Sequence, residues 1–195
     1  MKPAPRHPLT GLLRAFSAWM AGFAAVWFVA FAAMAQAREE LSPAERKAAV
    51  IAKLPAYVTW PRQAEVATSP LVIGVVGEDP FDGLLEKLVE GSRIDGRAVS
   101  VKFFPAGTEI GRCDLLFVPA AQQARWLESR RNNPAVEAIL TIGETDDFLK
   151  MGGMIRIVQA RKYKLEIHLN NARSAGLTIS SKLIDISTVV GGARG

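Results

Sequence analysis

The chain has 195 residues, of which 49% are hydrophobic and 22% charged, with a formal net charge of +5 and one cysteine, Cys113. A single cysteine excludes an internal disulfide, so the fold must depend on a buried apolar core, for which the length is sufficient. The positive charge alone would suit a nucleic-acid-binding protein.

The N-terminal segment has the layout of a secretory signal. An uncharged stretch, residues 15–37, ends in small residues at Ala35 and Ala37, and three basic residues precede it: Lys2, Arg6 and Arg14. This pattern predicts a signal peptide over residues 1–37, cleaved after Ala37. An uncleaved anchor is the alternative, because about 20 apolar residues span a bilayer. Cleavage is favoured because the stretch is rich in alanine and no basic cluster follows it.

Cleavage would remove three basic and no acidic side chains, lowering the formal charge from +5 to +2. The case for nucleic-acid binding then loses its main support. We expect the remaining residues, 38–195, to form one exported domain.

The first expected helix begins at Pro43, because Ser42 and Glu45 have the spacing of a capping box. Pro55 lacks a backbone N–H and should interrupt this helix near Ile51, and residues 60–61 should end the segment. Residues 71–76 are continuously apolar, which indicates a parallel strand buried on both faces.

Asp79 then offers an N-cap for a second helix, which Gly91 should end. Residues 95–96 predict a turn before a strand near the sheet edge, residues 99–103. Two more buried strands are expected at 114–118 and 138–142. Between them, residues 120–131 should form a helix, closed by residues 132–134, with three side chains facing inward: Ala120, Ala124 and Leu127.

After residue 153 the pattern changes. Residues 154–158 and 164–169 should pair as an antiparallel hairpin, because five residues are too few for a crossover. Asn170 should cap a short helix that ends at Gly176, and residues 177–190 should return to the domain. These elements predict an α/β fold with three layers, in which helices cover both faces of a mostly parallel sheet that includes this antiparallel hairpin.

The sequence offers little for catalysis, a cofactor or a metal. The mature chain would have one histidine, His168, expected on the solvated side of its strand, and no partner for a zinc site. Acidic residues cluster at 78–82 and at 144–147, where each cluster should open a helix, so capping is favoured over paired-carboxylate catalysis. Ser181 and Lys182 should point to opposite faces of a strand, which excludes a Ser-Lys pair. Cys113 should be a buried apolar residue, which is favoured over an intermolecular disulfide or a redox switch.

Two loops could bind a ligand. Residues 77–80 and 143–146 should lie at the carboxyl ends of neighbouring strands, where open α/β sheets usually place ligands. The C-terminal third is also basic, which indicates a solvated face or an attraction for a small anionic ligand or an acidic partner. The side chains concerned are Arg156, Arg161, Lys162, Lys164, Arg173 and Lys182.

Several separated segments together resemble the YfiR family of periplasmic proteins. They are residues 47–49, 57–61, 71–81, 96–97, 113–118, 140–144, 148, 152–155, 165–170, 175–177 and 179–183. The resemblance covers nearly all of the expected mature chain, in the family's order.

The resemblance implies a non-enzymatic regulator without a cofactor, in the periplasm of a Gram-negative bacterium. It would bind and repress a membrane-anchored diguanylate cyclase or another inner-membrane signalling protein, lower cyclic di-GMP and biofilm formation, and form a homodimer. A ligand-binding sensor acting in another signalling pathway is the alternative. Family members that sense redox state use cysteine pairs, which this chain lacks. Candidate partner- or ligand-binding residues are Trp60, Pro61, Gly77, Glu78, Asp79, Glu144, Gly152, Gly153, Ser181 and Lys182.

Overall fold

The computed structural model describes residues 41–61, 69–132, 138–159 and 163–191, and residues 41–195 form one compact unit. The expected signal peptide and its cleavage after Ala37 lie outside the described residues, as does the expected helix end at 133–134. They remain predictions.

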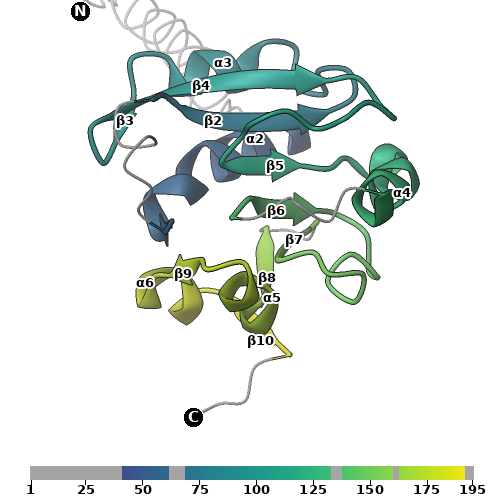
Figure 1. The fold of residues 1–195 in the computed structure, drawn as a ribbon. Helices are drawn as coiled ribbons and strands as arrows, with labels where there is room; N and C mark the ends of the chain where they lie inside the picture. The colour runs from purple at the N-terminus through teal and green to yellow at the C-terminus, as the bar shows by residue number, and fades with distance from the viewer. Residues whose placement is uncertain (1–40, 62–68, 133–137, 160–162, 192–195) are drawn as a thin grey trace, which may run out of the picture. The chain divides into compact units, whose positions relative to one another are not determined.

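An eight-stranded sheet forms the centre of the domain, in the order β10-β8-β7-β6-β5-β2-β4-β3 (Figure 1). Five strand pairs are parallel, while β3 with β4 and β7 with β8 are antiparallel. The strands are β2 (Leu71–Val76), β3 (Arg93–Ile94), β4 (Arg97–Phe104), β5 (Leu115–Phe117), β6 (Leu140–Gly143), β7 (Ile155–Val158), β8 (Lys164–His168) and β10 (Thr188–Val190). A small antiparallel sheet pairs β1 (Val58–Thr59) with β9 (Thr178–Ile179).

Helices cover both faces of the large sheet. One face packs on α2 (Pro43–Lys53), the 3₁₀ helix η1 (Leu54–Tyr57), α3 (Leu84–Val89), α5 (Leu169–Ser174) and α6 (Ser181–Asp185). The other face packs on α4 (Gln123–Asn132), which follows the 3₁₀ turn η2 (Ala120–Gln122), and on the turn around Phe148. The predicted three-layer α/β class is therefore confirmed.

The apolar runs behave as predicted. Every residue of β2, β5 and β6 is buried, and β7 and β8 form the predicted antiparallel hairpin. The capping box is also present, with Ser42 N–H donating to Glu45 Oε2 over 2.6 Å and Glu45 N–H donating to Ser42 Oγ over 3.1 Å. Pro55 lies in the first turn of η1, where no N–H is needed, so α2 continues past Ile51 to Lys53.

Asp79 does not cap the second helix. Its carboxylate accepts hydrogen bonds from Phe81 N–H (2.8 Å) and Gly83 N–H (2.5 Å), which holds a tight turn instead. Asp82 and Gly83 both adopt positive φ in this turn, so α3 begins only at Leu84.

The inward side of α4 also differs from the prediction. Trp126 and Gln123 are buried, whereas Ala120 and Ala124 are exposed and Leu127 is half-buried. The helix carries few apolar side chains, and the large indole of Trp126 fills the space over the sheet, stacked on Phe148 at 5.1 Å between ring centroids.

Two further expectations near the C-terminus are wrong. His168, not Asn170, is the N-cap of α5, because its Nδ1 accepts a hydrogen bond from Asn171 N–H over 3.2 Å. His168 is also the last residue of β8, where its ring is half-buried on the same face of the strand as Glu166. Ser181 and Lys182 open α6, with Ser180 as its N-cap, because the serine hydroxyl satisfies a free backbone N–H there.

Candidate functional site

The strand order creates a crevice at the carboxyl ends of β2 and β5. After β2 the chain crosses one face of the sheet through α3 to reach β4, whereas after β5 it crosses the other face through α4 to reach β6. The two loops therefore diverge from adjacent strands, which is the place where open α/β sheets bind ligands. The loop beside residues 77–80 is thus the one that follows β5. The expected partner loop, 143–146, follows β6, which is separated from β2 by β5.

A cavity of about 810 Å³ occupies this crevice. Its described lining comes from the ends of β2, β4 and β5 and from the start of α4, namely Val76, Gly77, Glu78, Asp79, Pro80, Phe103, Pro105, Ala106, Pro119, Gln122 and Arg125. Gly77 has φ +93°, and a Cβ there would lie 3.1 Å from Gln122 Nε2. The positive φ favours a glycine at this position, where the β2 loop approaches the Gln122 side chain of η2.

The charges of the cavity come from Glu78, Asp79 and Arg125. The Asp79 carboxylate already accepts two backbone N–H groups, so Glu78 and Arg125, which are both exposed, are the charges available to a ligand. Prolines and Phe103 supply apolar surface between them. The described lining includes no histidine, cysteine or hydroxyl side chain, so it offers no hydroxyl or thiol nucleophile paired with a base. Such a cavity can bind a small molecule with polar ends and an apolar body.

Glu144 does not join this cavity. Its carboxylate forms an ion pair with Lys47 of α2 and accepts a hydrogen bond from Ala120 N–H over 3.1 Å. The Lys47 ammonium also lies 6.0 Å from the ring centroid of Phe117. Glu144 therefore ties α2 to the turn that precedes α4. The cluster at 144–147 opens no helix, because residues 145–152 form turns.

Gly152 and Gly153 lie in the turn before β7, and Gly153, together with Gly143, makes room for Phe148. A Cβ at Gly153 would lie 2.3 Å from the Phe148 ring, and one at Gly143 would lie 2.4 Å from it. The two glycines thus leave the space in which this fully buried ring sits.

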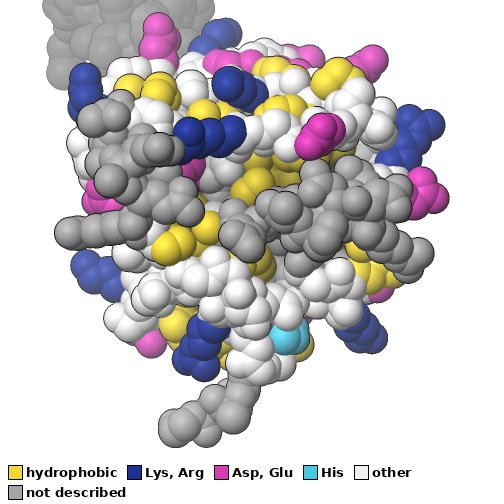
Figure 2. All heavy atoms as spheres, viewed as in Figure 1, with side chains coloured by type: hydrophobic (Ala, Val, Ile, Leu, Met, Phe, Trp, Pro, Cys, Tyr) yellow, Lys and Arg dark blue, Asp and Glu magenta, His cyan; other side chains and the backbone are white. Residues whose placement is uncertain are grey.

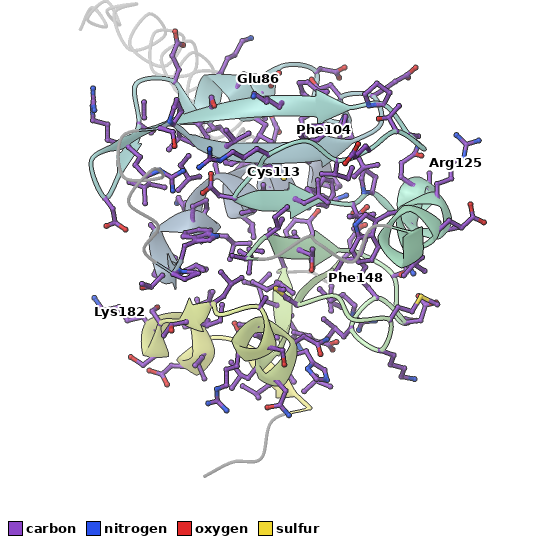
Figure 3. The ribbon with its side chains drawn as sticks, viewed as in Figure 1. Glu86, Phe104, Cys113, Arg125, Phe148 and Lys182 are labelled. Carbon is purple, nitrogen blue, oxygen red and sulfur yellow. The ribbon has the colours of Figure 1, made fainter. Side chains whose placement is uncertain are left out.

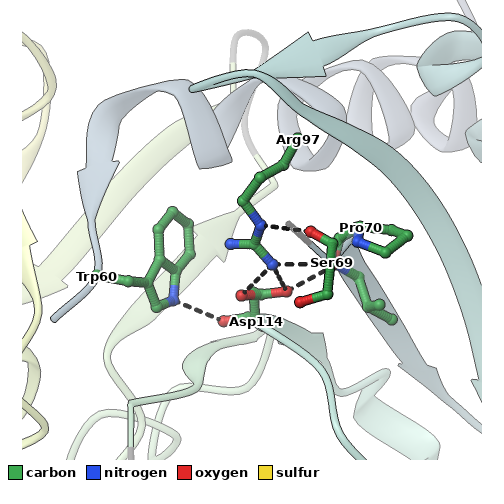
Figure 4. A network of polar contacts seen from close by, with 6 residues as sticks. Trp60, Ser69, Pro70, Arg97 and Asp114 are labelled. Atoms are coloured by element: carbon green, nitrogen blue, oxygen red, sulfur yellow. Dashed lines mark hydrogen bonds and ion pairs between the residues drawn. The ribbon is translucent and has the colours of Figure 1, made fainter. Parts of the chain in front are cut away.

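Trp60 lies at the opposite, amino-terminal end of the sheet, in a polar network (Figure 4), and Pro61 follows it with its ring close to Gly176. Trp60 Nε1 donates to the carbonyl of Asp114 over 3.1 Å. The Arg97 guanidinium donates to both carboxylate oxygens of Asp114 at 2.8 Å and to the carbonyls of Ser69 and Pro70 at 2.9 Å. The carboxylate also accepts Val72 N–H over 2.8 Å. This network, called the clamp below, joins the starts of β2, β4 and β5.

Ser181 and Lys182 are exposed in the first turn of α6. Figure 3 shows Lys182 and Arg125 on opposite sides of the domain. Of the ten candidate residues, Gly77, Glu78 and Asp79 therefore lie together at the cavity, and the rest are spread over four other places. The reasoning from sequence missed Phe103, Gln122 and Arg125. Pro119 could have indicated Gln122 and Arg125. It marks the carboxyl end of a buried strand, and these two residues follow that end.

The basic side chains of the C-terminal third do not form one anion site. Arg156 forms ion pairs with Asp146 and with Glu166, the latter at 2.9 Å, so its charge is compensated. Residues 161 and 162 lie outside the described part of the chain. Lys164, Arg173 and Lys182 are exposed, on β8, α5 and α6 respectively.

Cys113 is buried, as predicted, and packs in the apolar cluster under α4. Burial, with a smaller contribution from the Asp114 carboxylate, raises the pKa of this thiol from 9.0 to about 12. The thiol is therefore protonated at neutral pH. Within the described ranges, no three His, Cys, Asp or Glu residues come together as a metal site, and no helix is long and apolar enough to cross a bilayer.

The fold and the cavity together define an α/β domain with a ligand-sized site at its topological switch point. Residues 44–188 match the protein family described as YfiR/HmsC-like, and the chain belongs to that family. This is a regulatory family of the periplasm, associated with the diguanylate cyclase pathway.

No curated protein matches the sequence. Among solved structures, one similar chain is the ABC domain in complex with L-Trp from Streptococcus pneumonia. The similarity covers 75% of this chain and 60% of that chain, at 12% identity and a TM-score of 0.45.

Proposed function

We propose that this protein binds and represses a membrane-anchored diguanylate cyclase, or another inner-membrane signalling protein, and acts without catalysing a reaction. Membership of the YfiR/HmsC-like family over residues 44–188 carries this proposal. The described cavity lining has no hydroxyl, thiol or imidazole group to pair with its carboxylates, which supports a binding role over catalysis. Repression would lower cyclic di-GMP and biofilm formation.

Export fits this role. Cleavage after Ala37 would release residues 38–195 into the periplasm, where they would meet the periplasmic part of the cyclase. The homodimer that the family resemblance implies belongs to the same proposal.

The protein, purified from the periplasm and immobilised, should recover a diguanylate cyclase from detergent-solubilised membranes of the same cells. The control is the same protein denatured before it is immobilised, which should recover no cyclase. Recovery of no cyclase by the native protein, or equal recovery by the native and the denatured protein, would contradict the proposal.

A second function is supported by the cavity at the carboxyl ends of β2 and β5, which would bind a small ligand. The Arg125 guanidinium would bind an anionic group of the ligand, and the Glu78 carboxylate would accept a hydrogen bond from a donor group of the ligand. Both functions can operate together, since a ligand that prefers the free protein shifts the complex by its differential affinity.

Thermal-shift screening with nucleotides, amino acids and peptidoglycan fragments tests this second function. A true ligand should raise the melting temperature of the wild-type protein and not that of the Arg125→Gln variant. A Lys150→Gln variant provides the matched control, because Lys150 is exposed and is not among the cavity lining residues. No stabilisation by any compound would remove the cavity as a ligand site.

A further inference from the structure

The strand β4 has an edge that the fold covers only in part. On its inner side β4 pairs with β2 from Val99 to Phe104. On its outer side the described pairing is with β3, which opposes only Arg97 and Ala98. Figure 1 shows β3 and β4 at the outer end of the sheet. The second half of β4 thus presents an open edge.

The hydrogen bonds identify which backbone groups face outward. Val99 N–H donates to Ser92 on the outer side over 3.1 Å, whereas the Phe104 carbonyl accepts Gly77 N–H on the inner side over 2.8 Å. Because consecutive residues of a strand face opposite sides, the N–H and C=O groups of Val101 and Phe103 point outward. No described residue pairs with these four groups. Unpaired strand edges of this kind readily accept another strand.

The side chains along this edge differ between the two faces of the sheet. Val99 and Val101 are half-buried against the core under α2 and α3, and Phe103 is 36% exposed. Lys102 lies on the other face, exposed. Figure 2 shows apolar atoms between charged side chains over β2 and β4. An added strand would cover apolar surface on one face and meet one ammonium group on the other.

A second copy of this chain fits the edge poorly. A twofold axis through Val101 would place Phe103 of one copy opposite Val99 of the other, where Ser92 already occupies the outer side. An axis through Lys102 would use only the outward N–H and C=O groups of Val101 and Phe103. It would, however, place the Lys102 side chains of the two copies directly opposite each other. Like charges in that position destabilise strand pairing.

We propose that the open edge of β4 is a docking site for an extended segment of a partner protein that carries an acidic side chain opposite Lys102. The segment runs antiparallel to β4, exchanges backbone hydrogen bonds with Val101 and Phe103, and places apolar side chains beside theirs. Lys102 blocks self-pairing and favours the acidic partner. The identity of the partner as a signalling protein rests on the proposed function. The preference of the β4 edge for a strand with an acidic residue opposite Lys102 does not depend on that function.

The Lys102→Glu variant of this same protein is a suitable probe. Its own β4 carries an acidic side chain at the position that would lie opposite Lys102 of the wild-type β4 edge. We would titrate fluorescently labelled wild-type protein with the unlabelled Lys102→Glu variant and, separately, with unlabelled wild-type protein. The variant should bind about tenfold more tightly, since an opposed pair of like charges becomes a pair of opposite charges. Equal affinities would overturn the proposal, whatever the effect of the protein on cyclic di-GMP.

Two controls distinguish strand docking from general electrostatics. Lys150→Glu, an equivalent charge change at another exposed site, should bind labelled wild-type protein no better than wild type does. Val101→Pro in the labelled protein removes the outward N–H and leaves the pairing with β2 intact, so it should abolish the gain of Lys102→Glu. Circular dichroism and the urea midpoint would establish that this variant is folded. A gain that persists in the folded Val101→Pro protein would also overturn the proposal.

Discussion

The two ends of the sheet differ in how their polar groups are used. At the amino-terminal end, Arg97 and Asp114 have side-chain exposures of only 9% and 13%, and they bond to each other and to the backbone. At the carboxyl-terminal end, Glu78 and Arg125 are exposed around a cavity. The contrast separates residues that hold the domain together from residues that remain available for binding.

The difference also clarifies the resemblance between this chain and its family. Trp60, Arg97 and Asp114 all belong to the segments that carry the resemblance, and all three meet in the clamp. These residues therefore mark the fold. Trp60, a candidate for partner binding, has its indole N–H engaged within the domain.

The largest effect should come from breaking the clamp. Asp114→Ala leaves the Arg97 guanidinium largely buried without its carboxylate, which should lower the free energy of unfolding by about 3–5 kcal/mol. Urea denaturation measures the change. Asp79→Ala, at the cavity end, loses only turn hydrogen bonds and should cost about 1 kcal/mol. Equal losses in the two variants would contradict the contrast between the ends.

Alkaline pH should weaken the same end of the domain through Cys113. Because burial raises the pKa of this thiol to about 12 in the folded protein, against 9.0 unfolded, its contribution is complete below pH 9 and is lost between pH 9 and 12. The loss should be about 1.4 kcal/mol per pH unit. Urea midpoints measured over this range should fall more steeply for wild type than for Cys113→Ala. Parallel curves would show that the thiol ionises equally in both states.

A smaller effect is expected where the clamp meets the end of β1. Trp60→Phe keeps the aromatic ring and removes the hydrogen bond from Nε1 to the Asp114 carbonyl. The free energy of unfolding should fall by about 1 kcal/mol, the usual net value of one such bond. Recovery of cyclase from membranes should be unaffected by this variant. A loss of recovery without a loss of stability would restore Trp60 as a partner-binding residue.

The smallest effect on stability should occur at the cavity. Glu78→Gln and Arg125→Gln remove exposed charges, so each should change the free energy of unfolding by no more than about 0.5 kcal/mol. Ligand-induced stabilisation should nevertheless be lost in Arg125→Gln. Calorimetry with and without the ligand checks both statements. A strongly destabilised Arg125→Gln protein would show that Arg125 helps to hold the domain together.

The local sequence was sufficient to predict the buried strands, the capping box and the hairpin, because each depends on neighbouring residues. The position of β5 between β2 and β6 depends on pairing between distant segments, and no local pattern encodes it. For this reason the reasoning from sequence paired the loop at 77–80 with that at 143–146. Likewise, Asp79 is a residue type that is common at N-caps. The positive φ of Asp82 and Gly83, which delays the start of α3, is a property of the folded turn and cannot be read from the residue types.

The most direct test of the central claim is the cellular level of cyclic di-GMP. We would compare a strain lacking this gene with the same strain complemented by the full chain, and with one complemented by the chain without residues 1–37. We expect cyclic di-GMP to rise on deletion, and we expect the exported protein, but not the unexported protein, to reverse the rise. An unchanged level on deletion would contradict repression of a cyclase.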